Sequence, residues 1–358
     1  MNNSLTDVAG FLVGHAAVPG PNALSGTTVV LAPPGGAVAA VAVRGGGPGT
    51  RETDALDPRN VVERIDAVVL TGGSAYGLDA AAGVMAWLEE QQRGVRVGPE
   101  PHQVVPVVPA ACLFDLGRGG DWRARPDAAV GRAAVEAAAS AGSDVAEGNV
   151  GAGTGAVVGG LKGGVGTASV TLTSGATVAA LAVVNAVGSP IDPHNGALYG
   201  EYGYVTDHQL PSPERHLAAR ARLDAVRTGM PPLNTTLAVV ATDARLTRPQ
   251  AQKLAGTSHD GLARAIRPVH LMHDGDTIFA LATGSHDSGP DSPDSPDSPD
   301  GPGRPGRTDR ALGPEELNHI LAAGADVVAR AIVRGVRAAV SVEGPGGTFP
   351  SYGDLYGS

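Results

Sequence analysis

Short apolar runs of strand length alternate along this chain with longer stretches in which apolar residues recur at helical spacing. Strands bounded by glycine and polar turns are predicted at 67–71, 170–172, 178–185, 236–242 and 277–283. Helices are predicted at 79–90, 127–141 and 312–339. Pro314 and Glu315 lie in the first turn of the last helix, a position that suits proline because no backbone donor is needed there.

Three other patterns make more local predictions. Residues 26–43 predict a β-hairpin, with two strand-like runs joined by the Pro-Pro-Gly-Gly turn at 33–36. Thr247 and Pro249 indicate a helix start, and 260–266 predicts a second short helix. Residues 285–310 repeat Asp-Ser-Pro and lack core-forming side chains, so we expect a disordered surface insertion there.

Glycine-rich turns follow two of the predicted strands. Gly72 and Gly73 open the turn after 67–71, where backbone N–H groups can bind an oxygen anion. Tyr76 in this turn is either a packing residue or a side chain whose hydroxyl points into a cleft. The loop 44–53 has three consecutive glycines that let the main chain approach another group closely. Its two arginines and one glutamate suit either a buried ion network or a ligand contact.

The glycine-densest stretch, 148–166, contains a weak dinucleotide-binding pattern at Gly151, Gly153 and Ala156. No acidic residue follows between Glu147 and Asp192 to bind a ribose, so we do not expect a nucleotide. Lys162 is the one charged residue of that span. A lone charge in apolar sequence is expected to meet a specific partner.

Composition narrows the classes of function. The formal net charge is 26 − 36 = −10, without a basic block, so nucleic acid and anionic membranes are not expected partners. No uninterrupted apolar stretch reaches the ~18 residues of a membrane span. The single cysteine, Cys112, excludes an internal disulfide framework, and the absence of a secretory signal predicts a cytoplasmic protein. No His/Cys/Asp cluster has metal-site spacing, so we expect neither a metal nor a cofactor.

The candidate chemistry lies in 231–243. Pro-Pro-Leu leads to Asn234, and two hydroxyls, those of Thr235 and Thr236, precede a predicted strand. A threonine hydroxyl is a poor nucleophile without a base, but an N-terminal threonine can use its own α-amine, whose pKa is about 8. We therefore hypothesise that the protein cuts its own Asn234–Thr235 bond and that Thr235 becomes the nucleophile. The alternative is a loop asparagine followed by two ordinary strand threonines.

Three polar residues elsewhere could support such chemistry. Asn185 ends a predicted strand, where its amide could donate to a developing oxyanion. Asp274 and Asp276 flank Gly275 immediately before the strand 277–283. They form either a simple turn or a pair of acids that holds a catalytic network.

Several unusual stretches run through nearly the whole chain, namely 7–10 with 13–15, 44–52, 71–77, 150–156, 239–243 and 274–276. Together they resemble the DmpA-type aminopeptidases, which include L-aminopeptidase/D-esterases, β-peptidyl aminopeptidases and the nylon-oligomer endo-hydrolase. The resemblance implies an α+β fold, an αββα sandwich of the N-terminal-nucleophile-like type. It also implies one self-cleavage into subunits 1–234 and 235–358, which form one compact domain, and a homotetramer of cleaved units.

The resemblance also implies roles for individual residues. Thr235 matches the nucleophile, Asn185 the oxyanion-hole amide, Tyr76 a tyrosine that faces the reacting carbonyl, and Lys162 a lysine near the nucleophile. Asp274 and Asp276 would position the Thr235 amine and the region of Thr236. Thr235 together with Asp274-Gly275-Asp276 resembles the nylon-oligomer branch rather than the serine-type β-aminopeptidases.

The implied substrates are small peptides and amino-acyl amides, esters or oligomers. Two other classes of function remain open on the sequence. One is an ornithine acetyltransferase-like acyl transferase, which also cuts itself before a threonine. The other is a binding protein on the same fold that does not cleave itself.

Overall fold

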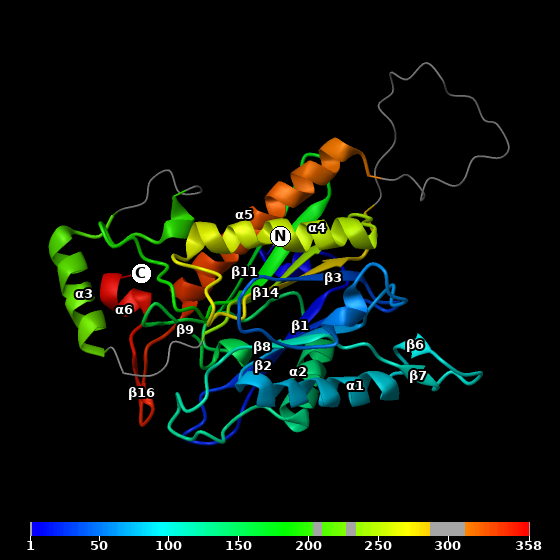
Figure 1. Ribbon diagram of the computed structural model, residues 1–358, viewed down its shortest axis with the longest axis horizontal. Coiled ribbons are helices and arrows are strands. Elements are labelled where there is room, and N and C mark those ends of the chain that lie inside the picture. Colours follow the sequence, from blue (N-terminus) through cyan, green and yellow to red (C-terminus); the bar gives the residue numbers. More distant parts are fainter. Residues whose placement is uncertain (1, 203–209, 227–233, 287–311, 358) are drawn as a thin grey trace, which may run out of the picture.

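Two five-stranded sheets lie face to face at the centre of the molecule (Figure 1). The structure is a computed structural model that describes residues 2–202, 210–226, 234–286 and 312–357. The proline-rich stretch immediately before Asn234, and all of the predicted insertion beyond residue 286, lie outside the described residues.

The first sheet has the strand order β1-β2-β5-β8-β4. Its strands are β1 (Leu12–Ala17), β2 (Gly26–Leu31), β5 (Ala67–Thr71), β8 (Ala110–Cys112) and β4 (Gly49–Arg51). The second sheet has the order β11-β12-β13-β14-β3. Its strands are β11 (Val165–Thr171), β12 (Thr177–Val183), β13 (Leu237–Thr242), β14 (Thr277–Ala282) and β3 (Val38–Val43). In this second sheet only the pair β13–β14 is parallel.

Two helices cover the outer face of each sheet. They are α1 (Ala80–Glu90) and α2 (Ala128–Ser140) on the first sheet, and α4 (Arg248–Ala265) and α5 (Pro314–Ala338) on the second (Figure 1). These four layers are the αββα sandwich that the resemblance implied. Among the described helices, none is both long enough and apolar enough to cross a membrane.

The remaining elements are short and lie around this frame. Helix α3 (Pro213–Val226) and α6 (Tyr352–Tyr356) contact each other at one end of the molecule (Figure 1). Two-stranded pairs are formed by β6 (Val95–Arg96) with β7 (Val104–Val105), β9 (Val157–Val158) with β10 (Leu161–Lys162), and β15 (Val342–Gly344) with β16 (Gly347–Phe349). The 3-10 helices are η1 (Leu5–Asp7), η2 (Thr53–Leu56), η3 (Ser74–Asp79), η4 (Gly151–Gly153) and η5 (Tyr199–Glu201).

The layers pack through large apolar side chains between the sheets and through glycine where a helix meets the outer face. The apolar layer between the sheets includes Phe11, Leu70 and Phe279, each at most 1% exposed. Burial of one such side chain is worth about 1.5–3 kcal/mol. On the outer face, a Cβ on Gly166 of β11 would lie 2.1 Å from the carbonyl oxygen of Ala331 in α5, so glycine is required at this contact.

The predicted hairpin at 26–43 is wrong. The turn forms, with the Gly36 N–H donating to the Pro33 carbonyl at 2.9 Å, but it carries the chain from one sheet to the other. β2 pairs with β1 and β5, whereas β3 pairs with β14. Every residue of β2 is buried, with Val30 in the layer between the sheets and Val29 and Leu31 against the outer helices, so long-range packing rather than the local turn sets its place.

The two helices predicted after Thr247 form one helix, α4, of 18 residues. Its middle contains Gly256, Thr257 and Ser258, which are weak helix formers. Leu254 and Leu262 on either side are fully buried in the layer that α4 shares with α5 and the second sheet. This packing keeps the helix continuous where local propensity is low.

Candidate active site

The topology of the second sheet brings the polar candidates to one edge. β13 and β14 are parallel, with Leu237 opposite Thr277, so the residues that precede the two strands lie side by side. These residues are 234–236 and 274–276, and an isolated bridge joins Asn234 to Asp274. β12 runs antiparallel to β13 and ends at Val183, opposite Leu237, which places Asn185 at the same edge.

Thr235 is buried beside the bond that we expect to be cut. Its Oγ1 hydroxyl donates to the carbonyl oxygen of Asn234 at 2.7 Å. The same oxygen accepts from the backbone N–H of Gly275 at 3.1 Å. A Cβ on residue 275 would lie 2.7 Å from this hydroxyl, so only glycine lets β14's leading loop approach it this closely. The hydroxyl is thus held against the peptide group that precedes it.

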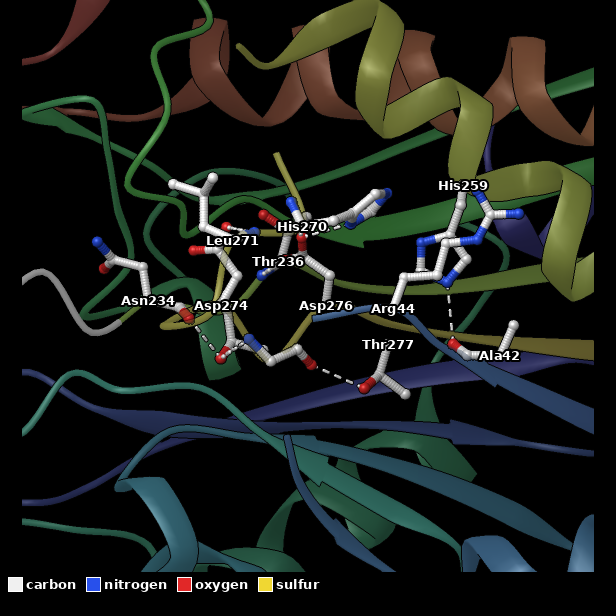
Figure 2. A network of polar contacts seen from close by, with 12 residues as sticks. Ala42, Arg44, Asn234, Thr236, His259, His270, Leu271, Asp274, Asp276 and Thr277 are labelled. Atoms are coloured by element: carbon white, nitrogen blue, oxygen red, sulfur yellow. Dashed lines mark hydrogen bonds and ion pairs between the residues drawn. The ribbon is translucent and has the colours of Figure 1, made fainter. Parts of the chain in front are cut away.

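Asp276 fixes the next residue of the chain. Its Oδ1 accepts from the Thr236 N–H at 2.9 Å, and the Thr236 hydroxyl donates to the Asn185 carbonyl at 3.1 Å. Its Oδ2 accepts from the His270 N–H at 3.1 Å and contacts His270 Nδ1 at 2.8 Å (Figure 2). A carboxylate with three such partners is held in one orientation.

A second histidine packs against this network from α4. The His259 and His270 rings meet edge to face with centroids 4.9 Å apart (Figure 2). His259 Nε2 shares a hydrogen bond with the Ala42 carbonyl at 2.9 Å. Burial lowers the pKa of His259 to about 4, so it is neutral at pH 7.

Asp274 is held less completely than Asp276. Its Oδ2 accepts from the Leu271 N–H at 2.8 Å, while its Oδ1 is buried and has no hydrogen-bond partner among the described residues. Burial raises the pKa of this carboxyl, and the neighbouring Asp276 raises it further. The glycine loop after β3 supports the pair, because the Gly47 N–H donates to the Asp274 carbonyl at 2.7 Å. This is the close main-chain approach that the three glycines at 45–47 predicted.

Asn185 is completely buried, and its amide is oriented by two donors. Its Oδ1 accepts from Arg118 Nη1 at 2.6 Å and from the Val157 N–H at 3.0 Å. Its Nδ2 reaches the Phe114 carbonyl only at 3.5 Å, the outer limit for a hydrogen bond. The oxygen is therefore occupied, and the NH₂ group is the edge of the amide that can still donate.

Arg118 connects the two halves of the site. Besides Asn185, its Nη1 donates to the Gly155 carbonyl at 2.7 Å, and its Nη2 donates to Asn234 Oδ1 at 2.6 Å. Burial lowers the pKa of Arg118 to about 10, which leaves the guanidinium charged at pH 7. Arg118 is not among the residues predicted from the sequence, since nothing in its local pattern marks a buried arginine.

Lys162 is buried, and its Nζ donates to the carbonyls of Gly153 at 2.8 Å and Gly163 at 2.6 Å. The specific partners expected for this lone charge are thus backbone carbonyls. Burial lowers its pKa to about 7, assisted by the nearby positive charge of Arg118. In the described part of the chain, no hydrogen bond joins Lys162 to Thr235.

Gly72, Gly73 and Tyr76 lie at the end of the first sheet. The Gly73 N–H donates to Asp115 Oδ1 at 2.7 Å, so the anion at this turn is a side chain of the protein itself. Asp115 links the turn to the site through the Arg118 N–H, which donates to its carbonyl at 3.2 Å. Tyr76 is 56% exposed, and the Arg125 guanidinium lies over its ring at 3.8 Å. No hydrogen bond of the described residues joins Tyr76 to Thr235.

A pocket of about 640 Å³ opens beside the candidate bond. Asn234 and Arg118 line it, together with Arg220, Arg267 and Leu223. Within the described residues, no group of three or more His, Cys, Asp or Glu is placed to hold a metal ion.

Comparison with known proteins gives one family. The sequence model of peptidase family S58 matches residues 3–349. A protein of Mycobacterium tuberculosis named as an uncharacterised aminopeptidase is 48% identical over 99% of this chain and 98% of its own length. A 6-aminohexanoate-oligomer endohydrolase of Kocuria is 32% identical over 74% of this chain and 70% of its own length.

Solved structures give the same fold. A β-aminopeptidase from Burkholderia superposes with a TM-score of 0.71 at 24% identity, over 99% of this chain and 92% of that one. An L-aminopeptidase D-Ala-esterase/amidase from Ochrobactrum anthropi superposes with a TM-score of 0.67 at 22% identity, over 98% and 91%. The latter structure is described as a variant of the Ntn hydrolase fold.

Proposed function

This chain belongs to peptidase family S58 and is a hydrolase of the aminopeptidase or amidase type, and we propose that Thr235 is its nucleophile after self-cleavage of the Asn234–Thr235 bond. The observation that carries the proposal is the position of Thr235 Oγ1. It lies 2.7 Å from the Asn234 carbonyl oxygen and accepts from the Gly275 N–H at 3.1 Å. A hydroxyl in contact with the preceding peptide group is where an intramolecular attack on that group begins.

In maturation, the Thr235 oxygen attacks the carbonyl carbon of Asn234 and its proton passes to the departing nitrogen. The Asn234–Thr235 amide thereby becomes an ester, which water hydrolyses to a carboxylate at Asn234 and a free threonine. In turnover, the new α-amine accepts the hydroxyl proton while the hydroxyl attacks the substrate amide. Asp276 holds Thr236, and with it the amine of the preceding residue, in place.

Asn185 is proposed to stabilise the oxyanion of each tetrahedral intermediate. Its oxygen is occupied by Arg118 and Val157, which leaves its NH₂ group to donate. One such donor is typically worth about 3 kcal/mol of transition-state stabilisation. Tyr76 and Lys162 are proposed as further members of the site from the resemblance alone, because their described contacts are with Arg125 and with backbone carbonyls.

The substrates we propose are small peptides and amino-acyl amides or esters. An acyl transferase or a binding protein that does not cleave itself is less favoured, because the family match spans 3–349 and the close relatives are named as aminopeptidases. The relatives named as 6-aminohexanoate-oligomer hydrolases make ω-amino acyl oligomers a second substrate class to test.

Intact mass and N-terminal sequencing of the purified protein test the nucleophile. We expect two fragments of 234 and 358 − 234 = 124 residues, the second starting at Thr235. Thr235→Ala should remain a single chain and lose at least about a thousandfold of the hydrolysis of amino-acyl amides, because no hydroxyl is left to attack. Thr235→Ser should still be cut.

Thr236→Ala is the control for this experiment. It removes the neighbouring hydroxyl, which donates to the Asn185 carbonyl, and should still yield a fragment that begins at Thr235. An uncut wild-type chain, or a Thr235→Ala variant that is cut and active, would overturn the proposal.

The resemblance also leads us to propose a homotetramer of cleaved units in the cytoplasm. Light scattering of the purified, cleaved protein measures the assembly directly. A mass equal to one 35.7 kDa unit would contradict the tetramer.

A further inference from the structure

The side chain of Asn234, the residue before the proposed cut, is bound by Arg118. Its Oδ1 accepts from Arg118 Nη2 at 2.6 Å, a hydrogen bond to a charged donor. Arg118 is 7% exposed, and its Nη1 donates to Asn185 and to the Gly155 carbonyl. One rigid group therefore touches both the residue whose carbonyl is attacked and the amide proposed to bind the oxyanion.

The surroundings of this contact favour an oxygen-bearing group. Asn234 and Arg118 line the 640 Å³ pocket, and Arg220 and Arg267 lie in its wall. Asp224 is the one carboxylate among the described residues that line it. This wall is positive although the whole chain has a formal charge of −10. A pocket of this charge attracts carboxylate and carboxamide oxygens.

The proposed cut would change what Arg118 contacts. Once the peptide bond is cut, Asn234 is a free chain end and nothing ties its side chain to Thr235. The acyl group of a substrate must then place its carbonyl carbon against the same Thr235 oxygen and near the same Asn185 amide. Its side chain enters the space that Asn234 held, where a buried N–H of Arg118 lacks its partner unless the substrate supplies one.

We propose that Asn234 is a built-in copy of the preferred acyl group, and that Arg118 is a specificity residue selecting aminoacyl groups with a side-chain carboxamide or carboxylate, asparaginyl and aspartyl. This inference rests on Thr235 being the nucleophile. A site built to hydrogen-bond a substrate oxygen discriminates strongly against an analogue that lacks it, because the buried donor then stays unpaired.

The test compares 4-nitroanilides of asparagine, aspartate and leucine with the cleaved wild-type enzyme. Leucine has nearly the shape of asparagine but offers no oxygen. We expect kcat/KM for the asparaginyl and aspartyl substrates to exceed that for the leucyl substrate by about tenfold to a hundredfold. Arg118→Met should bring these ratios close to one, even if the altered support of Asn185 lowers all three rates.

Arg220→Met is the matched control. Arg220 lines the same pocket, is exposed, and makes no hydrogen bond to Asn234 in the described structure. This variant should keep the asparaginyl-to-leucyl ratio. If Arg118→Met keeps that ratio, or Arg220→Met abolishes it, the assignment to Arg118 is wrong.

Self-cleavage supplies a second readout that does not depend on Arg118 variants folding. Asn234→Asp keeps an oxygen for Arg118, whereas Asn234→Leu removes it. We expect the leucine variant to be cut about tenfold more slowly than the aspartate variant, followed by mass spectrometry from the moment of purification. Equal cleavage rates would overturn the inference.

Failure of the inference can be told from failure of the proposed function. An enzyme that is cut before Thr235 and hydrolyses all three anilides with similar kcat/KM has the proposed function without the proposed selectivity. A chain that is never cut and hydrolyses none of them lacks both.

Discussion

The two sides of the Asn234–Thr235 bond are held in different ways. On the Thr235 side, the chain enters β13 at once, and that strand pairs with β12 and β14. The Thr236 N–H donates to Asp276, and its carbonyl accepts from the Thr277 N–H at 3.2 Å. On the Asn234 side, the described contacts are one side-chain bond to Arg118, the bridge to Asp274, and the bond that the Asn234 carbonyl accepts from the Thr235 hydroxyl.

We expect Thr235 to stay in place after the proposed cut and the Asn234 end to move away. Thr235, the proposed nucleophile, leads directly into a central strand, and the Asp276 carboxylate holds the next residue through the Thr236 N–H. The Asn234 side is held by the bridge to Asp274 and by Arg118, which also lines the pocket. If the protein cuts itself as proposed, this asymmetry would keep Thr235 in place while Asn234 makes way for a substrate.

Asp276→Asn should loosen the Thr235 side of the bond and have the largest effect on self-cleavage. Asp276 accepts from the Thr236 N–H, the His270 N–H and His270 Nδ1, and a neutral amide cannot keep all three bonds. Hydrogen bonds to a charged group are worth about 1.5–3 kcal/mol each, so we expect self-cleavage to slow by about a hundredfold. A time course of the two fragments measures the rate.

Asp243→Asn provides a control at the opposite end of β13. Its Oδ1 accepts from the Thr177 N–H at 2.8 Å, so this carboxylate also binds a strand N–H, but far from the bond. Its cleavage rate should stay near that of the wild type. If Asp276→Asn is cut as fast as Asp243→Asn, the Thr235 side does not depend on Asp276.

Lys162→Met should change how the free energy of unfolding depends on pH. Lys162 lies in the segment before the proposed cut. The folded pKa of Lys162 is about 7, against 10.5 in the unfolded chain, because burial opposes its charge. Between these values the unfolded state binds more protons, so wild-type stability should rise with pH, by at most about 1.4 kcal/mol per unit. The rise begins near pH 7, and below that pH the group contributes no slope.

Urea unfolding at pH 6.5, 7.5 and 8.5 measures this effect in a Thr235→Ala background, which keeps a single chain. The difference in stability between the Lys162 parent and Lys162→Met should grow in favour of the parent as pH rises. Lys253→Met replaces an exposed lysine of α4 and should show no such trend. A difference that is flat with pH would mean that Lys162 stays charged when folded.

Thr247→Ala should have the smallest effect. It lowers the stability of the protein without touching either side of the Asn234–Thr235 bond. Thr247 caps α4, with its side chain and that of Gln250 forming a capping box. Loss of the cap should cost about 1 kcal/mol of stability. Self-cleavage should continue at the wild-type rate, since α4 begins after β13 has ended, and Thr247→Ser should restore the stability. A slowed cut in Thr247→Ala would show that global stability, rather than local geometry, sets the rate.

Much of the fold could be predicted, because strands such as 67–71 and 277–283 are continuous apolar runs bounded by turn residues. Their order in the sheets could not be read in the same way. The turn residues Pro33–Gly36 are typical of a hairpin, and the turn forms, yet β3 crosses to the second sheet. β3 pairs there with β14, a strand far away in the sequence, so the local turn could not reveal its partner.

The candidate site likewise contains residues that the sequence could reveal and one that it could not. Thr235, Asp274 and Asp276 could be proposed from sequence because each directly precedes a recognisable strand, and parallel pairing then brings them together. Arg118 could not. Its partners Asn185 and Asn234 are 67 and 116 residues away, and its own segment has neither helical nor strand periodicity.

The strand order of the second sheet, β11-β12-β13-β14-β3, has a consequence for the lifetime of the protein. A cut before Thr235 leaves β13 and β14 on one polypeptide, flanked on both sides by strands of the other. Neither piece then holds a complete sheet, so a unit that unfolds could re-form only by finding its counterpart in solution. Folding would be a first-order event before the cut and a concentration-dependent one afterwards, and the persistence of the working enzyme would rest on how slowly it opens.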